Sequence, residues 1–126
     1  MIYKRNEYFR YTFGEPCEAT FRLIKDANEG STAEMSKQGK CFLIDISPSG
    51  LRVFSELHIA IDKIKHVEIN FTLDETPISM LGEFIWSRRK MDGVEYGIQL
   101  VGDAESEQLI ISELKMRSKK EHDSEK

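Results

Sequence analysis

Cysteine and histidine are scarce in this sequence, which has two of the first, three of the second and no Cys-x-x-Cys pair. A disulfide framework or a zinc site is therefore not expected, and Cys17 and Cys41 are interpreted as buried thiols on strands. No apolar run approaches the ~20 residues of a membrane span, and the N-terminus lacks the apolar core of a signal peptide. These absences predict a cytoplasmic protein without membrane insertion.

An excess of positive charge is also lacking. The formal net charge is −4 over 126 residues, which argues against sequence-independent binding to nucleic acid or to an anionic membrane. Any site for an anion must therefore be local. A chain of this length is expected to form a single domain around one core.

Alternating apolar and polar residues predict a series of short strands. The predicted strands cover residues 12–25, 39–46, 50–54, 66–73, 78–88 and 94–100. Gly82 marks a bulge or a close approach within one of them, and Ile59, Ile61 and Ile64 suggest a loop packed on the core. A helix follows, with Asp103 as its N-cap. Because no strand–helix–strand alternation occurs, we expect an all-β fold, a six-stranded antiparallel barrel with a C-terminal helix.

The turn between two of these strands carries the most informative motif. Asp45 and Ser47 lie two residues apart on a predicted strand and should point to the same side. A carboxylate beside a hydroxyl offers an acceptor next to a donor and acceptor, which suits the edge of a guanine base. Gly50 permits a positive φ or a close backbone approach. The alternative is a turn in which Asp45 and Ser47 cap their own backbone.

The N-terminal segment interleaves aromatic residues with the bases Lys4, Arg5 and Arg10. We interpret residues 1–11 as an extended arm that docks by its aromatic side chains and presents its arginines. Guanidinium groups bind phosphate with two hydrogen bonds and stack on planar rings. The rest of the chain is predicted to form a barrel with its helix over residues 12–119 and a charged tail over residues 120–126.

Taken together, these motifs resemble the PilZ domain family over nearly the whole chain. The strand motif, Asp or Asn followed by x-Ser-x-x-Gly, is intact as Asp45, Ser47 and Gly50. The arginine motif RxxxR of the family lies in the segment from Arg5 to Arg10. The later pattern of the family is matched by three features of the chain, namely Gly82, Trp86 and the run Tyr96-Gly97-Ile98.

The resemblance implies a six-stranded barrel and a non-enzymatic receptor for cyclic di-GMP, with no cofactor. Its ligand-binding residues would be Arg5, Asn6, Arg10, Asp45, Ser47 and Gly50. The chain departs from the pattern at one position, because the residue four before Arg10 is Asn6 instead of arginine. Arg5 sits one position earlier, where some relatives keep an extra arginine that reaches the ligand.

The implied mechanism is a change in the arm and in the protein surface on ligand binding. As a monomer or weak homodimer, the domain would then regulate an unidentified effector protein in motility, polysaccharide or biofilm output. The alternative, favoured by Asn6, is a degenerate PilZ domain that binds no nucleotide and serves protein–protein interaction.

Two further classes of function have less support. An oligonucleotide-binding barrel would use Trp86 and the basic hairpin tip at Arg88, Arg89 and Lys90, but the acidic net charge opposes it. Catalysis is not expected, since no two carboxylates pair on one strand and no Ser–His or Cys–His set shares an element.

Overall fold

The computed structural model describes residues 10–25, 34–35 and 38–124. Within these residues, seven strands precede one helix: β1 (Tyr11–Lys25), β2 (Glu34–Met35), β3 (Gly39–Ser47), β4 (Gly50–Ser55), β5 (His66–Thr72), β6 (Pro77–Lys90), β7 (Gly93–Val101) and α1 (Ala104–Ser124). The strands pair antiparallel in the order β2-β1-β3-β4-β7-β6-β5, and β1 also pairs with β5. The pairing of β1 with β5 closes six strands into a barrel. The two-residue strand β2 pairs with the end of β1 and lies outside this ring. The predicted fold class is confirmed.

The barrel interior holds a single apolar core. It includes Leu43, Val67, Ile69 and Tyr96, which are almost inaccessible to solvent. The Tyr96 hydroxyl donates to Leu57 O at 2.7 Å and accepts from Ile59 N at 2.8 Å. These two bonds fix the loop after β4 on the barrel, and Ile59 and Ile61 pack against the core as predicted.

The two cysteines differ in their environment. Cys41 lies in the core, where burial raises the pKa of its thiol to about 12. Cys17 is only half-buried, so the prediction of a buried thiol is right for Cys41 and only partly right for Cys17. Burial again raises the pKa of the Cys17 thiol.

Gly82 is a position of close approach and not a bulge. It pairs in regular register with Val67 on β5 and Leu100 on β7. A β-carbon at Gly82 would lie 2.6 Å from Ile98 Cγ2, closer than packed atoms come. The irregularity of β6 lies further along, between Phe84 and Trp86.

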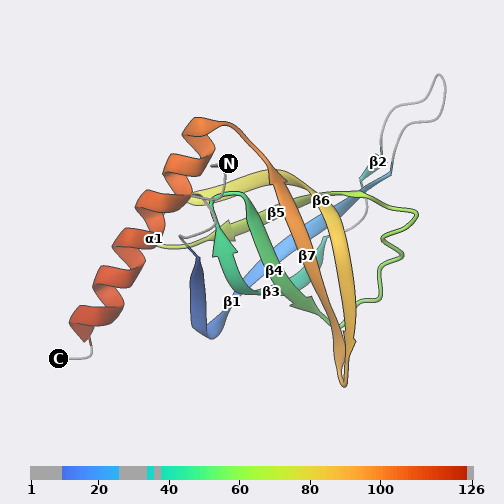
Figure 1. Cartoon of the computed structure of the whole chain (residues 1–126), viewed down its shortest axis with the longest axis horizontal. Helices are drawn as coiled ribbons and strands as arrows, with labels where there is room; N and C mark the ends of the chain where they lie inside the picture. The colour runs from blue at the N-terminus through green and yellow to red at the C-terminus, as the bar shows by residue number, and fades with distance from the viewer. Residues whose placement is uncertain (1–9, 26–33, 36–37, 125–126) are drawn as a thin grey trace, which may run out of the picture.

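Helix α1 lies outside the barrel, against one end of it (Figure 1). Asp103 caps it as predicted, since Ser106 N donates to Asp103 Oδ1 at 2.9 Å. The apolar stripe buries Ile110 and Leu114. The helix continues to Ser124, past the predicted barrel boundary at residue 119, and Arg117 and Lys120 in its second half bond to the turn after β5. No helix in the described part of the chain has the length and apolar character that crossing a bilayer requires.

Candidate functional site: an arginine-lined groove on the barrel wall

A register shift in β3 decides which way the motif residues face. Leu43 pairs with Val53, but Asp45 pairs with Arg52, so one extra residue is accommodated between the two pairs. Leu43 and Ile46 are both fully buried in the core. Asp45 and Ser47 flank the inward-facing Ile46 and therefore lie on the outer wall of the barrel.

Two arginines hold the Asp45 carboxylate on this wall. Arg10 Nη1 lies 2.6 Å from Asp45 Oδ1, while Arg52 Nε and Nη2 each lie 2.9 Å from Asp45 Oδ2. The Asp45 side chain is only 6% exposed, whereas those of Arg10 and Arg52 are 51% and 35% exposed. The carboxylate is thus covered by two guanidinium groups whose outer edges reach solvent.

The turn between β3 and β4 lies beside this cluster. Ser47 pairs with Gly50, and Ser47 Oγ donates to Gly50 O at 3.5 Å, the long limit for such a bond. A β-carbon at Gly50 would lie 3.2 Å from Ile98 O. The glycine therefore lets β4 approach β7 closely, and the hydroxyl of Ser47 is held only weakly by its own turn.

A groove of about 370 Å³ opens next to the turn. Three of its lining residues form a cross-strand row, in which Arg52 is opposite Gly97 and Gly97 is opposite Trp86. Asp45, opposite Arg52 on β3, continues this row beside the groove. The indole of Trp86 covers Gly97, since a β-carbon there would overlap the ring nitrogen. The groove thus has guanidinium groups at one side, a flat aromatic ring at the other and glycine backbone between them. Its lining residues are Arg10, Ser47, Ser49, Gly50, Leu51, Arg52, Ile85, Trp86, Gly97, Ile98 and Gln99.

The charges around the groove leave a small positive excess. Glu95, on β7, lies 3.8 Å from Arg52 Nη1 and 3.9 Å from Lys90 Nζ. Together with the Arg10–Asp45–Arg52 cluster, this makes three cationic and two anionic side chains. An anion would be attracted here despite the acidic character of the whole chain.

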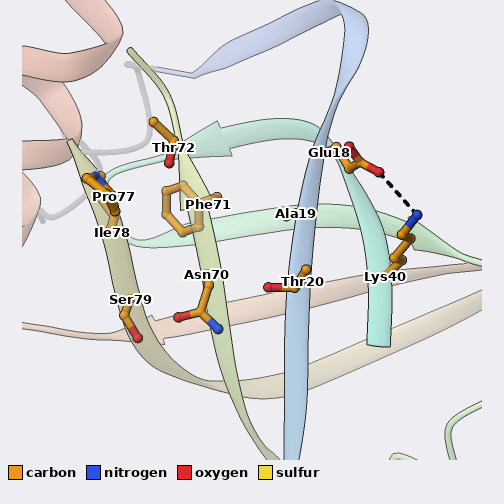
Figure 2. Close-up of a pocket in the computed structure, with 10 residues that line it drawn as sticks. All are labelled: Glu18, Ala19, Thr20, Lys40, Asn70, Phe71, Thr72, Pro77, Ile78 and Ser79. Atoms are coloured by element: carbon orange, nitrogen blue, oxygen red, sulfur yellow. Dashed lines mark ion pairs between the residues drawn. The ribbon is translucent and has the colours of Figure 1, made fainter. Parts of the chain in front are cut away.

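A larger hollow of about 610 Å³ lies elsewhere on the barrel, over β1, β5 and β6 (Figure 2). Its polar lining includes Thr20, Asn70 and Ser79, and its cation, Lys40, forms an ion pair with Glu18 at 3.6 Å. None of the described arginines lines it. We therefore place the candidate anion site in the smaller groove.

Four of the six predicted site residues come together here: Arg10, Ser47 and Gly50 line the groove, and Asp45 lies beside it, bound to Arg10 and Arg52. Arg5 and Asn6 lie outside the described residues. Arg52 and Trp86 were not predicted as site residues, although Trp86 was noted within the family pattern. Arg52 is seven positions from Asp45 along the chain, and the β3–β4 hairpin pairs the two residues in the same register as Ser47 with Gly50 and Ile46 with Leu51.

Metal binding finds no support in the described residues, where no group of three His, Cys, Asp or Glu side chains converges. His66 instead lies 3.3 Å from Glu83 Oε2 on the neighbouring strand.

The fold and the groove define a small closed β-barrel with an arginine-lined site on its outer wall. The sequence model of the PilZ domain matches residues 4–115. The chain belongs to the PilZ domain family. No curated protein matches it in sequence.

Two solved structures share the fold at low sequence identity. The PilZ domain with c-di-GMP of YcgR from Escherichia coli gives a TM-score of 0.60 at 14% identity, covering 94% of this chain and 98% of that one. The structure of YcgR in complex with c-di-GMP, also from Escherichia coli, gives 0.59 at 14% identity, covering 97% of this chain and 51% of that one. This chain therefore corresponds to about half of the longer YcgR chain.

Proposed function

We propose that this protein is a non-enzymatic, cytoplasmic receptor for cyclic di-GMP, which binds in the groove beside the turn between β3 and β4. The observation that carries the proposal is the pair of part-exposed guanidinium groups, Arg10 and Arg52, fixed on the buried carboxylate of Asp45. Membership of the PilZ family and the ligand of the YcgR structures support the choice of nucleotide.

The ligand carries two phosphates and two guanines, and the groove offers a partner for each group. Guanidinium donors suit a phosphate. The Asp45 carboxylate and the Ser47 hydroxyl suit the hydrogen-bonding edge of guanine. Because both oxygens of Asp45 already accept from arginine, a guanine would have to displace one of these contacts or use a remaining lone pair.

Arg5 and Asn6 complete the proposed set of ligand-binding residues. Arg5 would add a third guanidinium group, whereas Asn6 offers only neutral hydrogen bonds where the family motif has arginine. A good bidentate arginine contact to guanine is worth about 1–3 kcal/mol. We therefore expect binding that is weaker than in a domain with the full motif.

The proposed output is a change at the end of α1. Arg10 contacts the groove, and the next residue, Tyr11, donates a hydrogen bond from its hydroxyl to Glu121 on the helix. Glu121 also pairs with Arg117 at 3.2 Å. A ligand that moves Arg10 would alter the backbone beside Tyr11 and so the surface that the helix offers to an effector protein, with the domain acting as a monomer or weak homodimer.

The second candidate is a PilZ domain that binds a protein partner and no nucleotide. Asn6 favours this candidate. So do the ion pairs of Asp45, because both of its carboxylate oxygens already bind arginine and a cluster of this kind can be purely structural.

Isothermal titration of the purified protein with cyclic di-GMP at physiological salt tests the proposal. We expect micromolar binding by the wild type and no measurable binding by Arg10→Ala. The variant loses a hydrogen-bond donor to the phosphate and one of the two arginine partners of Asp45. Arg22→Ala is the matched control, since Arg22 is an exposed arginine near the far end of β1, the strand that follows Arg10.

Absence of heat and of any thermal shift for the wild type at high ligand concentration would contradict the receptor and favour the partner-binding domain. Equal affinity in Arg10→Ala and the wild type would leave a receptor but remove the proposed site.

A further inference from the structure

Arg52 belongs to neither of the two sequence motifs of the site, yet its side chain lines the groove and binds Asp45. We infer that Arg52 binds a phosphate of the nucleotide directly, together with Arg10. This inference rests on the proposed function, because it concerns the same ligand in the same groove.

The hydrogen bonds of Arg52 leave donors free for a ligand. Its Nε and Nη2 point to Asp45 Oδ2, and Nη1 lies 3.8 Å from Glu95 Oε1, too far for a hydrogen bond. A guanidinium group has five N–H donors. With 35% of its side chain exposed and the residue lining the groove, Arg52 can keep its bonds to Asp45 while it donates to a phosphate.

Asp45 orients the two arginines toward the same place. Arg10 binds one carboxylate oxygen and Arg52 the other, so the carboxylate spaces the two groups and prevents them from turning away. Because one carboxylate already holds both guanidinium groups, part of the entropy cost of ordering these side chains is incurred before the ligand binds.

Arg52 supplies the excess positive charge of the ion-pair cluster beside the groove. With Arg52, the groove cluster of Arg10, Arg52, Lys90, Asp45 and Glu95 has one excess positive charge. Without it, the cluster is neutral and Asp45 competes with the phosphate for Arg10. A dianionic ligand then gains little from the remaining charges.

Position in the fold distinguishes Arg52 from the arginines of the N-terminal segment. Arg52 is in the middle of β4, which pairs with β3 on one side and β7 on the other. Its backbone is fixed by both neighbours. Arg52 therefore supplies a guanidinium group from the rigid barrel, whereas Arg10 precedes the first strand.

The alternative role for Arg52 is purely structural, the neutralisation of Asp45 and Glu95. A structural role predicts a loss of thermal stability in Arg52→Ala without a change in the salt dependence of ligand affinity. A phosphate contact predicts weaker affinity and a smaller salt dependence, since one fewer ionic contact is screened.

The test combines titration with NMR on the intact protein. Cyclic di-GMP is titrated into the wild type, Arg52→Ala, Arg52→Lys and the control Arg22→Ala at several salt concentrations. We expect Arg52→Ala to bind about tenfold to a hundredfold more weakly, the loss typical of a bidentate arginine contact. Arg52→Lys should be intermediate because it keeps the charge but not the planar fork. In the wild type, the Nε–Hε resonance of Arg52 should shift on ligand addition, and that of Arg22 should not.

The outcomes separate the inference from the proposed function. Wild-type binding with an unmoved Arg52 resonance and an unchanged affinity in Arg52→Ala overturns the inference and leaves the receptor intact. Absence of wild-type binding overturns both. If Arg52→Ala fails to fold, the wild-type resonance decides, since it requires no variant.

Discussion

Gly97 and Trp86 lie opposite each other on β7 and β6, and their pairing shapes the groove. The indole occupies the space above the glycine, where any β-carbon would overlap it. Trp86 is nevertheless 37% exposed, and the guanidinium group of Arg88 lies over its ring. The absence of a side chain at position 97 is therefore what allows an aromatic wall beside Arg52.

Gly97→Ala is expected to displace the indole and to destabilise the fold by about 1–3 kcal/mol, the usual cost of overpacking. Trp86 is the only tryptophan of the chain, so its intrinsic fluorescence reports the displacement directly. Chemical unfolding followed by fluorescence measures both effects.

Gly14→Ala provides the matched control, because no described residue other than its chain neighbours comes within 4 Å of a β-carbon at that position. It should unfold within about 1 kcal/mol of the wild type. An unchanged emission spectrum in Gly97→Ala would show that the ring does not depend on this contact.

Single residues also show how far the sequence can predict the site. Asp45, Ser47, Gly50 and Arg10 were predictable because they belong to local motifs with fixed spacing. Arg52 was not singled out because it belongs to no local motif, although the hairpin register that pairs Ser47 with Gly50 also places Arg52 opposite Asp45. The bulge of β3 lies beyond this pair, between Leu43 and Asp45, and lets Leu43 and Ile46 both face the core. The alternation of side chains predicts faces only where a strand has no bulge.

At the level of elements, a buried carboxylate fastens α1 to the barrel. Glu113 Oε1 accepts from the backbone N–H groups of Thr76 and Glu75 at 3.0 Å each and of Asp74 at 3.2 Å. Lys120 pairs with Asp74 at 2.8 Å, and Arg117 donates to Leu73 O at 2.8 Å. The helix thus completes the hydrogen bonds of the turn between β5 and β6.

Glu113→Gln should lower the free energy of unfolding at pH 7 by about 1–3 kcal/mol, because hydrogen bonds to a charged acceptor are replaced by weaker ones. The N–H of Thr76, followed by those of Glu75 and Asp74, lowers the pKa of Glu113 below its ordinary 4.5. The ionised group therefore stabilises the fold above about pH 4.5, and this contribution is lost as the pH falls through the lower, folded-state pKa.

Urea unfolding at a series of pH values checks this prediction. The difference between wild type and Glu113→Gln should be largest at neutral pH and shrink in acid. Glu56→Gln is the control, since Glu56 is an exposed carboxylate in the loop after β4. A constant difference at all pH values would mean that the charge of Glu113 is not responsible.

The elements themselves were largely predictable, and the exceptions have physical causes. β4 and β5 follow the apolar alternation closely because their inner faces pack on one core. The length of α1 was underestimated, since its charged second half has no apolar stripe and is held by bonds to a distant turn. Such bonds depend on tertiary structure and leave no local pattern.

At the level of the whole molecule, the distribution of charge matters more than its sum. The net charge is −4, yet Arg10 and Arg52 gather at one groove. Two cations of the basic hairpin tip contact side chains of the domain itself: Arg88 lies 5.7 Å from the Trp86 ring centre, and Lys90 is close to Glu95. A continuous basic path for a polynucleotide is therefore missing from the described surface of the groove and hairpin.

Single-stranded DNA or heparin should accordingly bind weakly or not at all at physiological salt. Fluorescence anisotropy over a salt series measures this, because counterion release makes polynucleotide binding steeply dependent on salt. Tight, salt-sensitive binding that is lost in an Arg88→Ala and Arg89→Ala double variant would instead indicate an oligonucleotide-binding barrel.

The contact between Tyr11 and Glu121 has a consequence for protein engineering. It joins the first strand to the last turns of the helix, so the two ends of the folded domain meet at one corner. Domains with adjacent ends tolerate insertion into a loop of another protein. Arg10 lines the groove next to this corner. In a copy of the domain inserted into a host protein, a movement of Arg10 would therefore be passed to the host backbone at the point of insertion.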